Sequence, residues 1–454
     1  MERKSVAMQG NYEDLIEKLG KEIADAILDR ETSLAKRARL IDKDVAEVMR
    51  QAGQAAMILI FDVVAGQLVD EAKASGLTVQ SRPVITYNVI FGPVEVESPY
   101  LWKNGQSSKP VKDQMGLTHE GRSEAVERAL TDFGIEDSFK LAAKRFEEHH
   151  GWPVDKSTAR RVTETVGAQT EEYLKGRLEE ERKAYDLPLE ERPGVDLLVA
   201  ELDACKVRTG VLVESDQAST DIDETSQDKE HPQKRTRVIN FRDVRMGLIT
   251  DLDGQDKGYV GRVDTYPVVV HQLFSIAVKQ GLSSSTQVIA VADGGNGIRE
   301  ELERQFPHLL FILDQPHLKD HLYETAEAMG LEADERKKWV KKKLELIGTG
   351  RVPDALNQVR DEYAQKPIES LRRLISYLNK YEDAIDYQLF KAQRLPIGDG
   401  EVESAHRYIP QKRLNVPGAC WHPDNVNPML SLRVLRADDW WDDFWDNRAS
   451  RMVA

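Results

Sequence analysis

Two aspartates occupy positions where an α/β protein can do chemistry. Asp293 follows the apolar run at residues 288–292, which is typical of a buried central strand, and precedes a Gly-Gly-Asn-Gly turn. Asp203 lies within an earlier apolar run at residues 195–205 (VDLLVAELDAC). Carboxylates at strand ends of an open α/β sheet face the crevice where such sheets usually bind ligands. Taken alone, Asp293 could equally be a turn or helix-capping residue before a glycine-rich loop.

Further polar residues follow later strands and helices. Asp314 ends the next predicted strand in LLFILDQPHL, and His317 comes three residues later, in the first turn of a predicted helix. Glu401 and Glu403 lie in IGDGEVESAHRY. Two residues on a helix are separated by about 200°, so at most one of these glutamates can face the two aspartates, and spacing does not decide which one.

Two aspartates and one glutamate at the end of a sheet would favour metal-assisted phosphoryl transfer. Three carboxylates in a dry site cannot all stay ionised without a cation. Mg²⁺ takes oxygen ligands and suits phosphate substrates, and a metal pair can activate a water or a 3′ hydroxyl for in-line attack. His317 could hydrogen-bond to a metal ligand or to the scissile phosphate. A histidine satisfied locally at a helix start is the alternative, and the sequence leaves both open.

Bulk composition indicates a soluble protein of two to four structural units. The chain has 454 residues, 40% hydrophobic and 31% charged, and a formal net charge of -15, which argues against coating nucleic acid through overall charge. Cys205 and Cys420 allow neither a disulfide framework nor a four-cysteine zinc cluster. The N-terminus lacks the apolar core of a signal peptide, and the longest apolar run, near QAAMILIF, is too short to span a bilayer. We therefore expect a cytoplasmic protein without a membrane partner.

The chain alternates between helical and β patterns. Residues 11–76 predict two or three helices, and residues 83–103 predict a hairpin around Gly92-Pro93. Residues 214–236 are polar and charged and predict a mobile loop. Residues 331–395 predict only helices, which indicates an insertion between the sheet and the helix that carries Glu403.

One helix pair has the layout of a helix-turn-helix DNA reader. Ser138 can cap a helix that ends near Gly151, and a second helix starts soon after. Its first turns hold the candidate DNA-binding residues Lys156, Ser157, Thr158, Arg160 and Arg161. From the residues alone, an ordinary helix pair with a solvated arginine face is the favoured interpretation.

Other basic residues could contact phosphates. RKKWVKKK, residues 336–343, places four lysines largely on one helix face: Lys337, Lys338, Lys341 and Lys342. A solvated face that compensates nearby acids explains this pattern equally well. After Glu403 come Arg407, Lys412, Arg413 and Arg433, which could hold DNA near a cleaved phosphate. The aromatic tail WWDDFW is more typical of core packing than of base stacking.

Four motifs in order resemble those of bacterial insertion-sequence transposases of the DDE class, in the Kra-type group related to Mutator-like transposases. They are LDACKVRTG, VADGGNG, ILDQPHLKDHL and IGDGEVESAHRYIPQKRLNVPGACW, and the resemblance spans roughly residues 80 to 445. It implies that Asp203, Asp293 and Glu403, rather than Glu401, bind two Mg²⁺ (or Mn²⁺) ions. It places Asp314 and His317 as supporting residues. Asp399 departs from the family pattern, where Ser is frequent.

The resemblance also implies an α/β fold with a ribonuclease-H-like catalytic core, an all-α insertion, and an N-terminal region that is helical and contains a β-hairpin. The implied domains are helical 1–78, β-hairpin 79–112, helix-turn-helix-like 113–190, first core part 191–328, helical insertion 329–395, and second core part 396–454 with the C-terminal helix. The implied partners are DNA, as terminal inverted repeats and target, and further copies of the chain as a homodimer or larger assembly at the bacterial nucleoid.

Two other functions remain open from the sequence. A metal-dependent nuclease on the same core would cut DNA without joining ends. A domesticated DNA-binding regulator would keep the fold without catalysis, although a binding protein has no use for three clustered carboxylates near phosphates.

Overall fold

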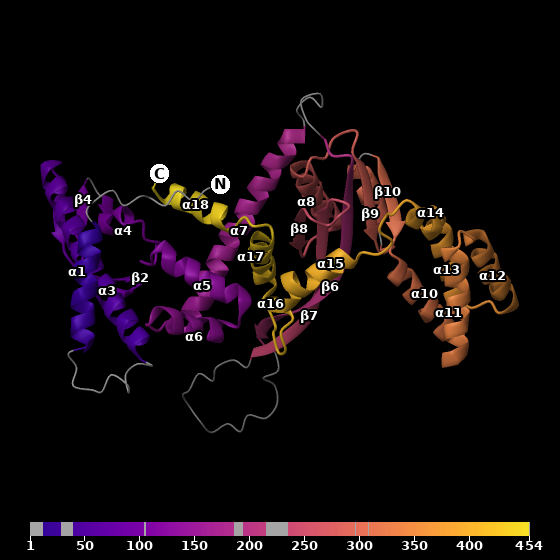
Figure 1. The fold of residues 1–454 in the computed structure, drawn as a ribbon, viewed down its shortest axis with the longest axis horizontal. Helices are drawn as coiled ribbons and strands as arrows, with labels where there is room; N and C mark the ends of the chain where they lie inside the picture. Colours follow the sequence, from indigo (N-terminus) through magenta and orange to yellow (C-terminus); the bar gives the residue numbers. More distant parts are fainter. Residues whose placement is uncertain are drawn as a thin grey trace, which may run out of the picture. The chain divides into compact units, whose positions relative to one another are not determined.

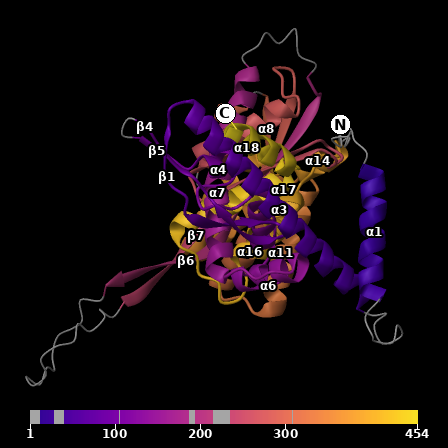
Figure 2. The same cartoon turned by 90° about the vertical axis from the view of Figure 1, so that its left-hand side faces the viewer.

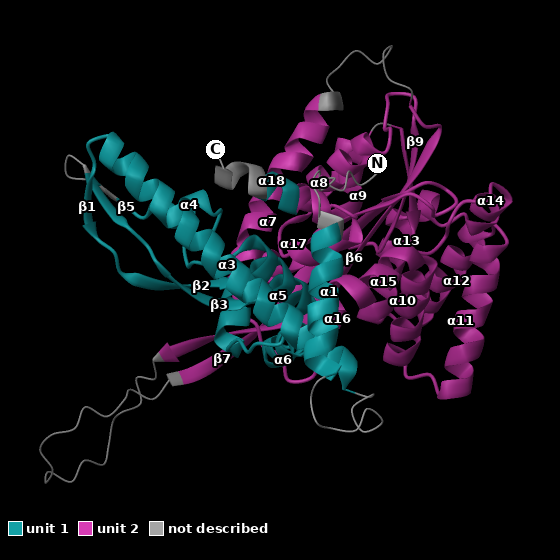
Figure 3. Cartoon of the chain, turned by 60° about the vertical axis from the view of Figure 1, so that its left-hand side comes forward, with its two compact units in different colours: residues 1–163, 445–454 teal, residues 164–444 magenta. Residues whose placement is uncertain are grey.

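The chain folds into two compact units. The computed structural model describes residues 12–28, 40–103, 106–185, 194–214, 235–295, 297–306 and 308–453. One unit holds residues 1–163 with 445–454, and the other holds residues 164–444 (Figure 3). The boundary falls within the long helix α7 (Lys156–Tyr185). Most of the predicted loop at 214–236 lies outside the described residues.

The smaller unit combines helices with short antiparallel strands. Its β2–β3 hairpin pairs Val89 with Gly92, as the Gly92-Pro93 signal predicts. A separate three-stranded sheet in the order β1-β4-β5 was not predicted from the sequence. The elements are α1 (Tyr12–Leu28), α3 (Ile41–Ala74), β1 (Thr78–Ser81), β2 (Val84–Val89), β3 (Gly92–Glu97), β4 (Tyr100–Lys103), β5 (Gln106–Ser108), α4 (Pro110–Gln114), α5 (Glu124–Glu136) and α6 (Phe139–His150).

Helix α3 is apolar along most of its 34 residues. Its buried side packs on the hairpin, where Phe61 stacks on Tyr87 with ring centroids 5.5 Å apart. By length and composition α3 could cross a membrane, and 17% of its most apolar window is buried. The sequence expectation considered only the longest uninterrupted apolar run, and the absence of a membrane partner stays a prediction. Core helices of soluble proteins can share this property.

The helix pair predicted around Gly151 forms as the capping signals indicate. The Ser138 hydroxyl accepts a hydrogen bond from the Leu141 N–H at 3.3 Å, and Gly151 ends α6 in the left-handed conformation with φ 74°. Asp155 then accepts from the Ser157 N–H at 2.7 Å where α7 begins. Binding of DNA by this pair stays a prediction.

The larger unit is built on a five-stranded mixed sheet in the order β10-β9-β6-β7-β8 (Figure 1). β6 pairs antiparallel with β7 and β7 with β8, whereas β9 and β10 run parallel to β6. The strands are β6 (Leu197–Glu214), β7 (Arg235–Thr250), β8 (Lys257–Arg262), β9 (Gln287–Ala292) and β10 (Leu309–Leu313). Helices α8 (Tyr266–Lys279) and α9 (Ile298–Gln305) connect β8 to β9 and β9 to β10.

A long helical segment follows β10, as the sequence predicts. It lies beyond the β9–β10 side of the sheet (Figure 1). Its helices are α10 (Gln315–Ala328), α11 (Ala333–Gly348), α12 (Val352–Gln365), α13 (Glu369–Lys380), η2 (Glu382–Ala384) and α14 (Tyr387–Ala392). The chain then continues through α15 (Gly400–His406), η3 (Arg407–Gln411), α16 (Lys412–Leu414), η4 (Pro423–Asn425), α17 (Val426–Ala437) and α18 (Trp441–Val453).

The aromatic tail packs inside the protein, as expected. Trp440, Trp441, Phe444 and Trp445 are each at most 5% exposed. The Trp440 ring is covered by two cations, with the Lys279 Nζ 4.4 Å and the Arg177 guanidinium 4.9 Å from its centroid. These rings are therefore unavailable for base stacking.

Asp438, at the end of α17, should make stability depend on pH. Its buried Oδ1 accepts the Tyr259 N–H at 3.0 Å, and burial raises its pKa from 3.8 to about 8. A raised carboxyl pKa contributes stability that is fully present below the unfolded value and is lost as pH rises through the folded value. We expect Asp438→Asn, which keeps an acceptor for Tyr259, to remove this decline. Melting temperatures of both proteins from pH 5 to roughly pH 9 check it, and parallel curves would contradict it.

Candidate metal centre at the sheet edge

Strand register brings three aspartates to one edge of the sheet. Leu202 of β6 pairs with Ala292 of β9, which in turn pairs with Leu313 of β10. Asp203, Asp293 and Asp314 each come one residue later. Because the three strands are parallel, these carboxylates leave the sheet at the same level.

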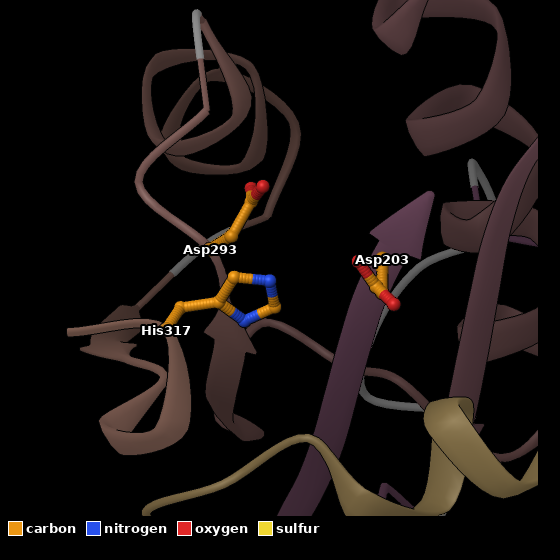
Figure 4. Close-up of side chains that lie close together, drawn as sticks. All are labelled: Asp203, Asp293 and His317. Atoms are coloured by element: carbon orange, nitrogen blue, oxygen red, sulfur yellow. The ribbon is translucent and has the colours of Figure 1, made fainter. Parts of the chain in front are cut away.

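Asp203, Asp293 and His317 form the most open cluster of possible metal ligands. One ligand atom from each lies within 4.8 Å of the others, and all three side chains are half-buried. They come from β6, from the loop after β9 and from α10, and the His317 ring lies between the two aspartates in Figure 4. This arrangement could hold a divalent cation.

Asp314 is the buried acceptor that organises the surroundings of this cluster. Its Oδ2 accepts from the backbone N–H of His317 at 2.7 Å and lies 2.8 Å from the Nδ1 of the same residue. Its Oδ1 accepts from the Asp399 N–H at 3.1 Å. The Asp314 side chain is fully buried, so these contacts fix α10, the imidazole ring and the approach to α15 together.

The cluster carries strongly perturbed charges. Burial raises the pKa of Asp203, and the neighbouring His406 and His317 oppose the rise. The hydrogen bond with Asp314 raises the pKa of His317 to about 9, so the ring is cationic at neutral pH. Burial and the Asp314 charge hold the pKa of Asp399 well above its ordinary range. The carboxylates are therefore the groups that a bound cation would neutralise, while the imidazolium donates hydrogen bonds instead of acting as a ligand.

Glu403, the predicted third metal ligand, lies outside this cluster. Its side chain is 66% exposed and its nearest cation is the Arg407 guanidinium at 3.8 Å. Glu401 forms an ion pair with Lys257 of β8 at 2.6 Å. Helix α15 nonetheless packs against β6. Its His406, one turn after Glu403, places its Nδ1 3.5 Å from the Asp203 carboxylate.

Two residues near this centre were missed by sequence reasoning. Glu201 is buried two residues before Asp203, and its carboxylate accepts the Val402 N–H at the start of α15 at 2.8 Å. Burial raises the Glu201 pKa to about 7. The other is His406, which is 3% exposed and has its pKa lowered by burial. The alternation Glu-Leu-Asp in an apolar strand was the available signal for Glu201, since residues two apart share a strand face.

Tyrosines of the helical segment hold the loops of the cluster. The Tyr381 hydroxyl donates to the Gly294 carbonyl at 3.1 Å, directly after Asp293. The Tyr387 hydroxyl donates to the Leu313 carbonyl at 2.9 Å, directly before Asp314. The predicted insertion is thus bonded to two of the three strand ends that carry the acids.

The predicted DNA-binding residues differ in accessibility. Most are exposed: Lys156, Ser157, Arg160, Arg161, Lys337, Lys338, Lys341, Lys342, Arg407 and Lys412, with Thr158 half-buried. Arg161 forms an ion pair with Glu120 at 3.0 Å. Arg413 is 4% exposed and stacks over Trp421 at 4.7 Å, and the buried Arg433 donates to the Tyr408 carbonyl. The interpretation of these last two as phosphate contacts therefore needs correction, because tertiary packing has enclosed both guanidiniums.

Comparisons with known proteins leave the family of this chain open. No protein-family model matches it, and none of the curated proteins compared matches its sequence. One matching solved structure is the Drosophila P element transposase strand transfer complex, with a TM-score of 0.24 and 10% sequence identity. The match covers 73% of this chain and 81% of that chain. A likeness at this level is weak, and no functional assignment rests on it.

Replacing Asp314 should loosen the whole centre. Both oxygens of the Asp314 carboxylate accept hydrogen bonds from backbone N–H groups. In Asp314→Asn one oxygen becomes an NH2 group, which donates, so one of these buried N–H groups loses its acceptor. We expect a loss of about 2 kcal/mol in the free energy of unfolding, measured with urea. In protein treated with EDTA, NMR titration should also show the His317 pKa falling from about 9 toward its ordinary value.

The exposed Asp320 on the same helix offers a matched control. Asp320→Asn should leave both the stability and the His317 titration unchanged. Equal behaviour of the two variants would mean that Asp314 does not organise this centre.

Proposed function

We propose that this protein is a DDE transposase with a ribonuclease-H-like core, which cleaves DNA at element ends and transfers the strands to target DNA. The observation that carries the proposal is the convergence of Asp203, Asp293 and His317 within 4.8 Å. The register of the sheet also supports it, since the parallel pairing of β6, β9 and β10 brings Asp203 and Asp293 to the same level. The motif resemblance supplies the reaction class.

The donor set fits hard divalent ions. Asp203 and Asp293 would hold Mg²⁺ or Mn²⁺ through carboxylate oxygens, and a bound cation would offset the burial that raises the Asp203 pKa. Two ions are proposed, with Glu403 as the further ligand. Its helix already packs on β6, and the proposal requires its exposed side chain to leave the Arg407 guanidinium and turn toward Asp203. At this site the ions would supply charge stabilisation for the phosphate in attack and departure.

His317 would contact the DNA phosphate, and Asp314 would hold the His317 ring in position. Asp314 contacts the Nδ1 of His317, which leaves the other ring nitrogen for the aspartate pair and the substrate. As an imidazolium, His317 would donate a hydrogen bond to a non-bridging oxygen of the scissile phosphate. Hydrolysis would break a P–O3′ bond, and the freed 3′ hydroxyl would then attack a phosphodiester of the target strand.

The proposal includes partners and location. The helix-turn-helix-like unit within 113–190 would recognise the terminal repeats, and the exposed lysines of α11 would neutralise phosphates. Pairing two element ends would require a homodimer or a larger assembly at the nucleoid of a bacterial cell. The domain ranges given by the sequence remain part of this proposal.

Transposition itself is the first test. A marker flanked by the gene's own neighbouring DNA should excise and insert with the wild-type protein. Asp203→Asn and Asp293→Asn should each lower this by more than about 100-fold, because losing even a group that supports a metal ligand costs about 10- to 100-fold. Nicking without joining would identify a nuclease. Tight binding to the flanks without movement from either protein would identify a regulator.

The two glutamates of α15 provide a matched pair. We expect Glu403→Gln to abolish strand transfer and to weaken Mn²⁺ binding measured by calorimetry. Glu401→Gln, which removes only the surface ion pair with Lys257, should retain both. The reverse result would move the third ligand to Glu401, and full activity of Glu403→Gln would reject the triad.

A further inference from the structure

Strands β6 and β7 continue well past the sheet that holds the metal centre. β9 pairs with β6 only as far as Leu202, and β8 pairs with β7 only as far as Arg245. Beyond these residues the two strands form a ribbon, defined here by residues 204–213 and 236–244, with an unbroken antiparallel register. Outside the ribbon, the Trp421 N–H and carbonyl bond to the backbone of Arg208 and Gly210, and the Asn415 side-chain amide donates to the Lys206 carbonyl at 3.1 Å. Figure 2 shows the ribbon projecting beyond the other strands.

One face of the ribbon combines cations with exposed apolar side chains. Cross-strand partners share a face, so the pairs Arg208–Phe241 and Leu212–Arg237 lie on the same side. Phe241 is 61% exposed and Leu212 is 58% exposed, values far above those of side chains that pack in a core. Lys206, Ile239 and the acidic Asp243 belong to this face by the same alternation, whereas Arg242, which pairs with Val207, lies on the other face.

The ribbon is basic although the chain is acidic. Its described residues hold four cations, Lys206, Arg208, Arg237 and Arg242, against one acid, Asp243, in a protein of net charge -15. All four are exposed, and none forms an ion pair with a carboxylate among the described residues. Exposed cations on a projecting element are suited to a polyanion.

We propose that this ribbon binds duplex DNA in a groove. A two-stranded β-ribbon fits the major groove, which is about 12 Å wide, and such ribbons are established DNA-reading elements. The arginines would contact phosphates, and Phe241 would lie against sugars and base edges. The ribbon extends the DNA surface of the proposed function and rests on it only for the identity of the substrate.

The ribbon is separate from the metal centre. Asp203 and Arg208 are five positions apart in a continuous register, so their side chains leave β6 on opposite faces. Variants on the ribbon should therefore leave Mn²⁺ binding intact, which allows the two proposals to fail independently.

The test uses the full chain and a random-sequence duplex of roughly 40 base pairs, with binding followed by fluorescence anisotropy against NaCl concentration. The triple variant Lys206→Gln/Arg208→Gln/Arg237→Gln, confined to the face that carries Phe241, should bind about 30-fold more weakly or worse. Its salt slope should drop by about 2 to 3, since each lost phosphate contact removes about 0.9. Phe241→Ser should weaken binding without changing the slope.

A charge-matched control is available on the helical segment. The triple variant Arg351→Gln/Arg372→Gln/Arg373→Gln removes three guanidiniums that are already paired with Asp354 and Glu369, so its affinity and slope should match wild type. Equal affinities of the two triple variants would overturn the proposal. The proposal would also be overturned if the ribbon variant bound DNA like wild type but changed from dimer to monomer in light scattering. That result would assign the ribbon to self-association. Loss of DNA binding by the ribbon variant, together with full transposition by Asp293→Asn, would reject only the proposed catalytic site.

Discussion

The buried carboxylate of Asp314 is the interaction on which the rest of the centre depends. Its two oxygens accept hydrogen bonds from the start of α10 and from the segment before α15, and one of them lies against the His317 ring. A carboxylate without solvent is stable only when donors or charges surround it, so the fold must bring all these groups to it. The same constraint makes the imidazole cationic and directs it toward Asp203 and Asp293. The buried charge of Asp314 thus fixes the geometry of a neighbouring, half-buried cluster.

Parallel strand pairing supplies the second constraint. The register that aligns Leu202, Ala292 and Leu313 places the three following acids side by side. Hydrogen-bonded strands fix these positions more rigidly than a flexible loop would. The helical segment then bonds to these strand ends through Tyr381 and Tyr387. An element that is inserted in the sequence is therefore structurally part of the centre. A rigid frame of this kind keeps like charges close before any cation arrives.

Charge is distributed unevenly over this acidic chain. Carboxylates gather where parallel strands end, whereas exposed cations gather on the ribbon that continues β6 and β7. The two features share strand β6, where Asp203 and Arg208 lie on opposite faces. This separation lets a polyanion be held by one surface while cations are held by another, without mutual neutralisation.

The sequence by itself determined the features that depend on neighbouring residues. Ser138 and Gly151 marked the ends of a helix, Gly92-Pro93 marked a hairpin, and apolar runs marked the strands that end at Asp293 and Asp314, because caps, turns and strand patterns involve only a few consecutive residues. Only the tertiary structure decided which distant groups meet. The Glu201–Val402 hydrogen bond and the approach of His406 to Asp203 each join segments about 200 residues apart in the sequence. The burial of Arg413 and the outward position of Glu403 follow from the packing that these contacts create. Residue type and spacing do not predict such long-range contacts, since the same Glu or Arg is equally compatible with a solvent-exposed face.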